Sequence, residues 1–217
     1  MQIHHLSENN SVLMHFLCQI RDVAIQQDRM RFRRNIERIG EIMAYEISKV
    51  LDYTPQQTQT PLGVKTSAVI STPIVICSIL RAGLPFHQGF LNYFDAADNG
   101  FISAYRYHPH QDDAFEIKVE YQAIGNYENA TVLLVDPMLA TGQSIVAVCN
   151  QLREKGGATQ IHLAVVIAAP EGIAYLEQEL PSNCHLWIAS IDEKLNEHKY
   201  IVPGLGDAGD LAYGTKL

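Results

Sequence analysis

Three charged side chains follow apolar segments of the chain, and their types suggest one site for a phosphorylated sugar. Arg81 follows an Ile- and Val-rich run at 73–80. Arg106 ends a second apolar run, and Asp136 follows a third at 131–135. Guanidinium groups suit phosphate because they present planar pairs of N–H donors, whereas a carboxylate accepts hydrogen bonds from hydroxyl groups. A ligand that carries both phosphate and hydroxyls would use all three.

The turn 139–144, with the sequence LATGQS, has the composition of a phosphate-binding loop. Small residues let backbone N–H groups approach an anion, Thr141 and Ser144 supply hydroxyls, and the next helix offers its unpaired N-terminal N–H groups. The turn lacks the Gly-Lys-Ser/Thr sequence of an ATP-binding P-loop, so that class is excluded. The alternative is that Thr141 or Ser144 only caps the helix, and the turn alone leaves both interpretations standing.

The segment GLGDAG at 204–209 matches the Gly-x-Gly-x-x-Gly sequence of dinucleotide sites in letters only. A dinucleotide site needs these glycines between a strand and a helix, with an acidic residue well downstream. Here Pro203 precedes the glycines and the sequence ends soon after them. The segment is therefore predicted to be a tight loop whose backbone can come close to a ligand.

Apolar segments that alternate with helical patterns predict the elements that position these residues. Strands are expected at 73–80, 100–106, 131–135, 161–169 and 185–190, and helices at 31–50, 85–94, 143–155 and 171–180. The helix at 31–50 is expected to be amphipathic, with one apolar face made by residues at spacings of three and four: Phe32, Ile36, Ile39, Met43, Ile47 and Val50. Continuous apolar strands between helices predict the α/β class, a parallel sheet flanked by helices. Ligands of such sheets bind beyond the carboxyl ends of the strands, where Arg81, Arg106 and Asp136 are expected.

Two polar segments interrupt this alternation. The proline-bounded segment 54–61 is expected to be a connector, and 107–120 is expected to leave the sheet as a flap. His87, His108 and His110 lie in or near these irregular parts, but without a strand or helix register between them they are interpreted as surface histidines. No metal-ligating set is predicted.

Composition limits the classes of protein that fit. With 217 residues, 47 % of them hydrophobic, and no repeats, the chain is predicted to form one domain, 1–217. A net charge of −8 argues against nonspecific nucleic-acid partners and anionic membrane surfaces. No apolar stretch approaches a membrane span, and the first residues do not resemble a signal peptide. Four scattered cysteines without a Cys-x-x-Cys pair indicate buried thiols and a cytoplasmic location.

Several blocks, in order along the chain, resemble the uracil phosphoribosyltransferases. They are ILRAGL (79–84), YR (105–106), VDPMLATGQS (135–144), AAPEGI (168–173), SIDEKLNEH (190–198) and YIVPGLGDAGD (200–210), followed by YGTK. The likeness covers most of the chain. Pro137 follows the aspartate, as in the uracil enzymes, where other phosphoribosyltransferases have a second acidic residue. The resemblance implies a type I phosphoribosyltransferase fold with a flap at 107–120 and a base-binding C-terminal loop at 200–217.

The resemblance also implies a reaction, in which uracil attacks 5-phosphoribosyl diphosphate (PRPP) to give UMP and pyrophosphate. Its catalytic residues would be Arg81, Arg106, Asp136 and Asp207. Its PRPP-binding residues would be these four together with Pro137, Met138, Leu139, Ala140, Thr141, Gly142, Gln143 and Ser144. Uracil would be bound by Ile201, Gly206, Asp207 and Ala208, largely through backbone groups. The resemblance further implies Mg²⁺ held mainly by PRPP and water, and a homo-oligomer, a dimer or higher.

The sequence departs from the family at three places. Gln143 and Pro85 stand where the family generally has glycine, and the flap at 107–120 is longer than usual and differs in sequence. Two alternatives to uracil phosphoribosyl transfer therefore stay open: a non-catalytic, nucleotide-binding regulator on the same fold, and a phosphoribosyltransferase for another base.

Overall fold

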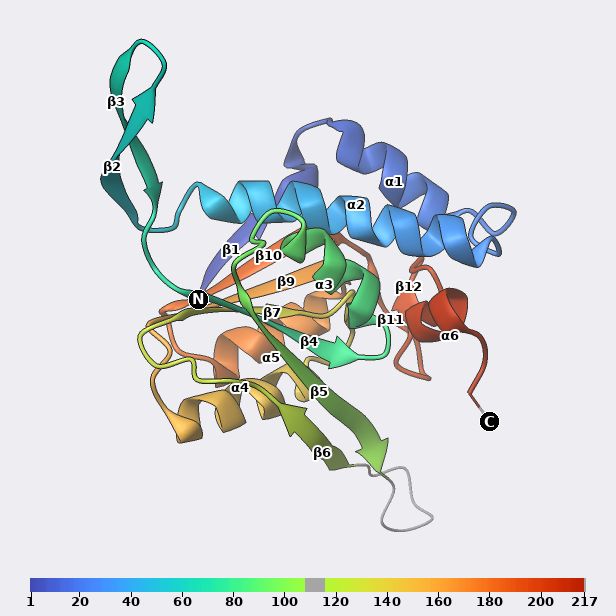
Figure 1. The fold of residues 1–217 in the computed structure, drawn as a ribbon. Helices are drawn as coiled ribbons and strands as arrows, with labels where there is room; N and C mark the ends of the chain where they lie inside the picture. The colour runs from blue at the N-terminus through green and yellow to red at the C-terminus, as the bar shows by residue number, and fades with distance from the viewer. Residues whose placement is uncertain (108–115, 217) are drawn as a thin grey trace.

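A mostly parallel sheet forms the centre of the molecule (Figure 1). The computed structural model describes residues 1–107 and 116–216. Within these ranges, the sheet has eight strands in the order β1-β10-β9-β7-β4-β5-β6, with β8 beside β9. The strands are β1 (Gln2–His5), β4 (Ile74–Leu80), β5 (Asp98–Tyr107), β6 (Glu116–Ala123), β7 (Thr131–Val135), β8 (Met138–Leu139), β9 (Gln160–Ala168) and β10 (Cys184–Ile191). The predicted parallel sheet is confirmed, with β6 as an antiparallel edge.

Helices cover both faces of the sheet (Figure 1). One face packs against α1 (Val12–Arg21), α2 (Arg29–Ser48) and α3 (Gly83–Leu91), and the other against α4 (Gln143–Lys155) and α5 (Pro170–Glu179). Strand β7 serves both cores because its side chains alternate: Leu133 and Val135 face the first group, Val132 and Leu134 the second. A short 3-10 helix, η1 (Leu6–Glu8), joins β1 to α1, and α6 (Ala208–Tyr213) lies near the C-terminus.

Helix α2 confirms the predicted amphipathic helix, with shifted ends. Asp28 caps its start, since the Asp28 Oδ1 accepts a hydrogen bond from the Arg31 N–H at 3.0 Å. The predicted apolar residues within it are buried: Phe32, Ile36, Ile39, Met43 and Ile47. The helix ends at Ser48, and Val50, expected on the same face, is 42 % exposed.

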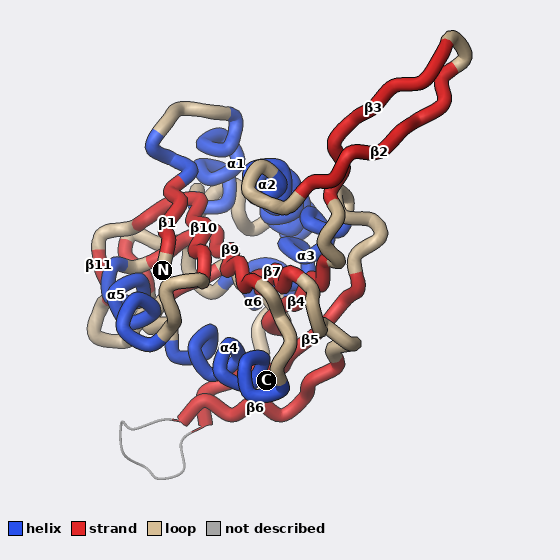
Figure 2. The backbone as a smooth tube through the Cα atoms, turned by 90° about the vertical axis from the view of Figure 1, so that its left-hand side faces the viewer, coloured by secondary structure: helices blue, strands red, loops and turns tan. Residues whose placement is uncertain are grey.

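The predicted connector at 54–61 is wrong. These residues belong to a hairpin of β2 (Tyr53–Thr60) and β3 (Gly63–Ile70), which projects away from the rest of the molecule (Figure 2). Both faces of the hairpin are exposed along most of its length. No apolar alternation marks it, because neither face is buried against the core.

The predicted excursion at 107–120 is wrong in its second half. Residues 108–115 lie outside the described part of the chain. From Glu116 onward the chain forms β6, which pairs with β5 inside the main sheet. Several more elements had no prediction: β1, η1, α1, β8, α6, and the two-stranded ribbon of β11 (Lys194–Leu195) and β12 (Ile201–Val202).

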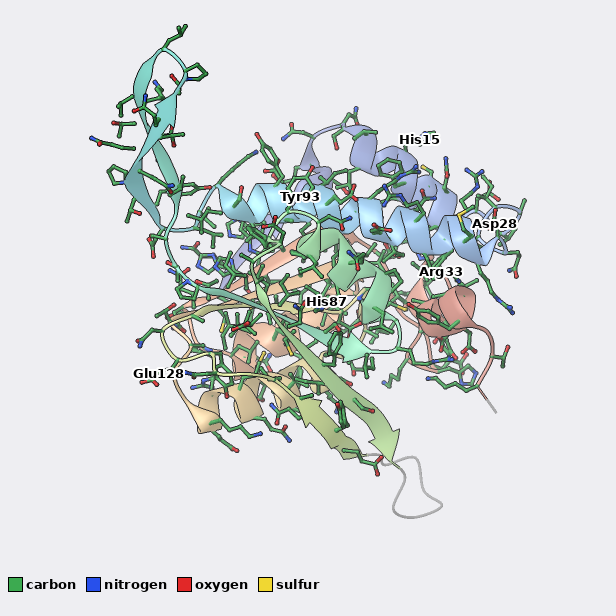
Figure 3. All side chains as sticks on the ribbon, in the orientation of Figure 1. His15, Asp28, Arg33, His87, Tyr93 and Glu128 are labelled. Carbon is green, nitrogen blue, oxygen red and sulfur yellow. The ribbon has the colours of Figure 1, made fainter. Side chains whose placement is uncertain are left out.

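His87 is a structural side chain, which corrects its interpretation as a surface histidine. It lies on α3 (Figure 3) and is 4 % exposed, its Nε2 lies 2.6 Å from Asn99 Oδ1, and its ring stacks on Phe101. Burial lowers the pKa of His87. His108 and His110 lie outside the described residues. Among the residues that are described, no three His, Cys, Asp or Glu side chains converge in a group that could hold a metal ion.

The cysteine prediction is confirmed at three positions. Cys77, Cys149 and Cys184 are buried free thiols, whereas Cys18 on α1 is exposed. Across residues 1–107 and 116–216, no helix combines the length and the apolar character needed to cross a bilayer.

Three histidines and a tryptophan stack across β1, β10 and β9. His162 is fully buried, accepts a hydrogen bond from Trp187 Nε1 at its Nδ1 (3.1 Å), and lies 3.1 Å from Gln160 Oε1 at its Nε2. The ring of His185 stacks on His162, and that of His4 on Trp187. Because both ring nitrogens of His162 are occupied, a second proton would meet the Trp187 N–H. Burial, and then the nearby His185 and His4, lower the pKa of His162 to about 3.

This arrangement predicts acid sensitivity. The unfolded chain binds a proton at this residue below the ordinary pKa of 6.5, while the folded chain stays neutral down to about 3. For each pH unit of acidification between these values, the free energy of unfolding should fall by about 1.4 kcal/mol through His162 alone. Urea titrations at pH 7, 5.5 and 4.5 measure this contribution as the difference in slope between the native protein and His162→Asn, because other groups titrate in the same range. His162→Asn keeps an acceptor for Trp187 and should lose less stability on acidification than the native protein, whereas His15→Asn on exposed α1 should match the native protein. Equal slopes in all three proteins would contradict the prediction.

Candidate active site

A cavity of about 560 Å³ lies at the carboxyl ends of β4, β5 and β7, where the parallel sheet predicts a ligand. Its walls come from five parts of the chain: the end of β4, β5, the segment after β7 with the start of α4, the turn before β12, and α6 with its flanks. The lining residues are Leu80, Arg81, Ala82, Ala104, Asp136, Met138, Ala140, Thr141, Gly142, Ser144, Ile145, His198, Lys199, Tyr200, Gly206, Asp207, Ala208, Gly209 and Lys216.

Asp136 lies directly after β7 and faces this cavity. Its N–H donates to the Ala164 carbonyl at 3.1 Å, which continues the sheet pairing by one residue. Its Oδ1 accepts a hydrogen bond from the Met138 N–H at 3.3 Å. Burial raises the pKa of Asp136 to about 7, and the Met138 N–H offsets only part of this rise. A carboxyl group that changes charge near neutral pH therefore lies in the cavity wall, a placement typical of functional sites.

The loop between Asp136 and α4 is held from behind by β9 and α5. The Pro137 carbonyl accepts hydrogen bonds from the Val166 and Ile167 N–H groups, each at 3.0 Å. Gly142 has a φ of 81°, and a Cβ atom there would lie 2.6 Å from Leu176 Cδ1 on α5. The loop therefore needs glycine at this position both for its backbone angle and for space.

Helix α4 begins at Gln143 with Gly142 as its N-cap residue, and no side chain caps it. The alternative in which Thr141 or Ser144 only caps the helix is therefore wrong. Both residues line the cavity, together with Ala140 and Gly142. The unpaired N–H groups of the first turn and two hydroxyl-bearing residues thus stand at one wall, which suits an anion.

Arg81 is tied to the C-terminal helix. Its Nη2 donates to Asp210 Oδ1 at 2.7 Å, its Nη1 donates to the Gly214 carbonyl at 3.1 Å, and its Nε is buried without a partner. Asp207 caps α6 by accepting from the Asp210 N–H at 2.9 Å. Arg33 of α2 donates to the Ala212 carbonyl at 2.7 Å, which fixes α6 against α2 (Figure 3). These contacts bring the end of β4 and the C-terminal loop to one cavity.

The structure collects most of the residues expected from the sequence. Arg81, Asp136, Asp207, Gly206 and Ala208 line the cavity, as do Met138, Ala140, Thr141, Gly142 and Ser144. Pro137, Leu139 and Ile201 are buried, and Gln143 is half-buried; these four are not among the lining residues. Arg106 lies in β5 opposite Ile117 of β6, and its side chain is outside the described part of the molecule.

Nine residues of the wall had no prediction, and four of them carry polar or charged side chains. His198, Lys199 and Tyr200 come from the turn before β12, and Lys216 comes from the chain after α6. Lys199 has a φ of 63°, in the left-handed region. The positive charge of the two lysines could have marked them as candidate site residues, because an acidic protein that binds a polyphosphate needs cationic side chains around it.

Comparisons with known proteins agree with this geometry. The sequence profile of the family described as uracil phosphoribosyltransferase matches residues 7–215. A Porphyromonas gingivalis protein named uracil phosphoribosyltransferase is 49 % identical over 217 residues, covering all of both chains. One of the same name from Pyrococcus furiosus is 35 % identical, covering 97 % of this chain and 89 % of its own. A solved structure from Aquifex aeolicus covers all of both chains with a TM-score of 0.88 and 28 % identity. The chain belongs to the uracil phosphoribosyltransferase family.

Proposed function

We propose that the protein transfers the phosphoribosyl group of PRPP to uracil, giving UMP and pyrophosphate. The observation that carries this proposal is the single cavity that gathers Arg81, Asp136, the loop 140–144 and the loop 206–208. Relatives that bear the family name align over the whole chain. In the reaction, the bond between ribose C1 and the pyrophosphate oxygen breaks and a bond from C1 to uracil N1 forms. Pyrophosphate leaves with the electron pair, and the N1 proton passes to water.

The charges in the cavity match those that develop in this reaction. As the C1–oxygen bond breaks, positive charge grows on the ribose ring and negative charge grows on the leaving pyrophosphate. Asp136 would accept hydrogen bonds from the ribose hydroxyls and stabilise the ring cation, while Arg81 and Arg106 would hold the pyrophosphate. The loop 140–144 would bind the 5′-phosphate through the first turn of α4.

Mg²⁺ fits this cavity as an ion held mainly by the substrate. Asp136 and Asp207 line the wall, and Mg²⁺ is usually bound by one or two carboxylates together with substrate phosphates and water. When bound, the ion would neutralise charge on the pyrophosphate.

The assay that tests the function mixes the purified protein with radiolabelled uracil, PRPP and magnesium and separates the products. We expect labelled UMP to form in proportion to enzyme. If no UMP forms and the protein still binds a nucleotide, the non-catalytic regulator is the better assignment. Product from another base alone would identify a different phosphoribosyltransferase.

Gln143 should be compatible with PRPP binding although the family generally has glycine there. It starts α4, as predicted, so its N–H is one of the first-turn donors that have no partner within the helix. Gln143 is not among the residues that line the cavity. We expect Gln143→Gly to change the PRPP affinity by less than about tenfold. The backbone entropy of glycine costs about 0.5–1 kcal/mol of stability, offset in part because the buried, unpartnered Gln143 Oε1 is removed.

Titration calorimetry with PRPP and urea unfolding measure the two quantities for Gln143→Gly. A glycine variant that binds PRPP a hundredfold tighter would show that the native loop is a compromised phosphate site. The non-catalytic function would then be favoured.

We also propose a cytoplasmic homo-oligomer. The hairpin β2–β3 stands away from the core (Figure 2), with Leu62 100 % and Val64 62 % exposed. A two-stranded hairpin is only marginally stable alone in water, so a second copy of the chain would cover it. Light scattering should give at least twice the mass of 24.3 kDa, and Leu62→Asp combined with Val64→Asp should lower it; a native monomer would refute the assembly.

A further inference from the structure

A buried ion pair lies behind the loop expected to bind uracil. Arg21 is the last residue of α1, and Asp192 directly follows β10. The two guanidinium Nη groups of Arg21 donate to the two carboxylate oxygens of Asp192, with Nη1 to Oδ2 at 2.8 Å. The Asp192 side chain is 2 % exposed and that of Arg21 is 22 % exposed. The pair is therefore bidentate and largely removed from water.

Both members of the pair also hold the backbone of one residue, Gly204. Arg21 Nη1 donates to the Gly204 carbonyl at 2.9 Å, and the Gly204 N–H donates to Asp192 Oδ2 at 2.8 Å. Gly204 has a φ of 64°, and a Cβ atom there would lie 2.2 Å from the Ile201 carbonyl oxygen. In the turn after β12, both the N–H and the carbonyl group of Gly204 are therefore hydrogen-bonded to the ion pair.

A glutamine extends this attachment by one residue. Gln26 Nε2 donates to the Leu205 carbonyl at 3.3 Å and to the Ile20 and Arg21 carbonyls at 3.1 Å. Gly206, the first residue of the 206–209 stretch that lines the cavity, follows immediately. The backbone that leads into the cavity is therefore anchored to the end of α1, on the side away from the ligand.

We propose that Arg21 and Asp192 are positioning residues for base recognition. Neither lines the cavity, so they act through the loop 201–208. The inference rests on the proposed function, because uracil would be recognised there by backbone groups that must stand at fixed positions. A buried ion pair is a poor source of stability, since desolvation offsets its attraction. Its two hydrogen bonds to Gly204 give the pair a different role, which is to set the geometry of the loop.

The test compares KM for uracil with KM for PRPP in a graded series. Asp192→Asn keeps the shape and one acceptor but loses the charge. The double variant Arg21→Met/Asp192→Leu removes the pair without leaving a buried charge. KM for uracil should rise about threefold in the first and about thirtyfold in the second, as expected for the loss of hydrogen bonds that hold the loop. KM for PRPP should stay within about twofold, because Arg81 and the loop 140–144 are untouched. Asp207 is the one expected PRPP-binding residue in the disturbed loop, and its place at the start of α6 is also held by the Arg81 contact with Asp210.

Two controls separate positioning from general damage. Arg34→Met/Glu37→Leu removes an ion pair on α2 with a 2.6 Å contact and should change neither KM. Hydrogen exchange without substrates should speed up at Gly204 to Gly206 in the double variant but not at Leu163 in β9. A uracil KM that stays unchanged, or rises together with the PRPP KM, would overturn the positioning role. Failure of the native protein to form UMP would instead refute the proposed function, and the exchange result would still decide whether the pair holds the loop.

Discussion

Uracil should be used about 10⁴-fold more efficiently than cytosine, as kcat/KM, because a site built on hydrogen bonds rejects a base that mismatches them. Cytosine carries a donor where uracil has the O4 acceptor, and it lacks the N3 proton. In the loop 201–208 backbone groups would face these positions, and a backbone N–H cannot become an acceptor. Each mismatch would leave a buried polar group unpaired.

Competition assays with both bases at limiting concentrations measure this ratio. Hypoxanthine serves as a control for a base of different size, and it should also be rejected. Comparable kcat/KM values for uracil and cytosine would refute uracil as the specific base. They would not contradict PRPP as the phosphoribosyl donor. A lower ratio in Arg21→Met/Asp192→Leu than in the native protein would tie the discrimination to the geometry of the loop.

Asp136→Asn should lower kcat about 10²- to 10³-fold, the effect typical of removing one preorganised electrostatic group. The amide keeps the shape and can still accept from the Met138 N–H, but it carries no charge to oppose the ribose cation. Because burial raises the pKa of Asp136 to about 7, the native enzyme should also lose kcat/KM for PRPP as the pH falls below about 7. The variant should lose this pH dependence.

The same substitution should make the fold more stable above pH 7. Between the ordinary pKa of 3.8 and the folded value near 7, the unfolded chain ionises while the folded chain stays protonated, so native stability falls as the pH rises. Asparagine carries no such cost. Because the carboxyl group is open to cavity water, we expect a gain of about 1–3 kcal/mol at pH 8 and little at pH 4. Urea unfolding of the native protein and of Asp136→Asn at the two pH values measures this gain in stability. A variant that is less stable than the native protein and fully active would exclude a catalytic role for Asp136.

Local sequence patterns were enough to predict the five central strands of the sheet and part of one wall of the site. Strand β7 and helix α4 match the predicted ranges 131–135 and 143–155, because burial forces apolar residues to recur at the period of each element. The composition of the turn 139–144 was compatible with an anion site or with a simple helix cap, and the structure removed the second interpretation because no side chain caps α4. The family blocks predicted that Asp207 and its neighbours would join them.

The contacts between groups that are distant in the sequence could not be predicted in this way. The hairpin β2–β3 buries neither face, so no periodicity could mark it. Arg81 pairs with Asp210 across 129 positions, and Lys199 and Lys216 reach the cavity from two separate segments. The Arg21–Asp192 pair joins the end of α1 to the end of β10. Local patterns report whether each residue is buried, whereas these contacts depend on how whole elements pack, which no short stretch of sequence encodes.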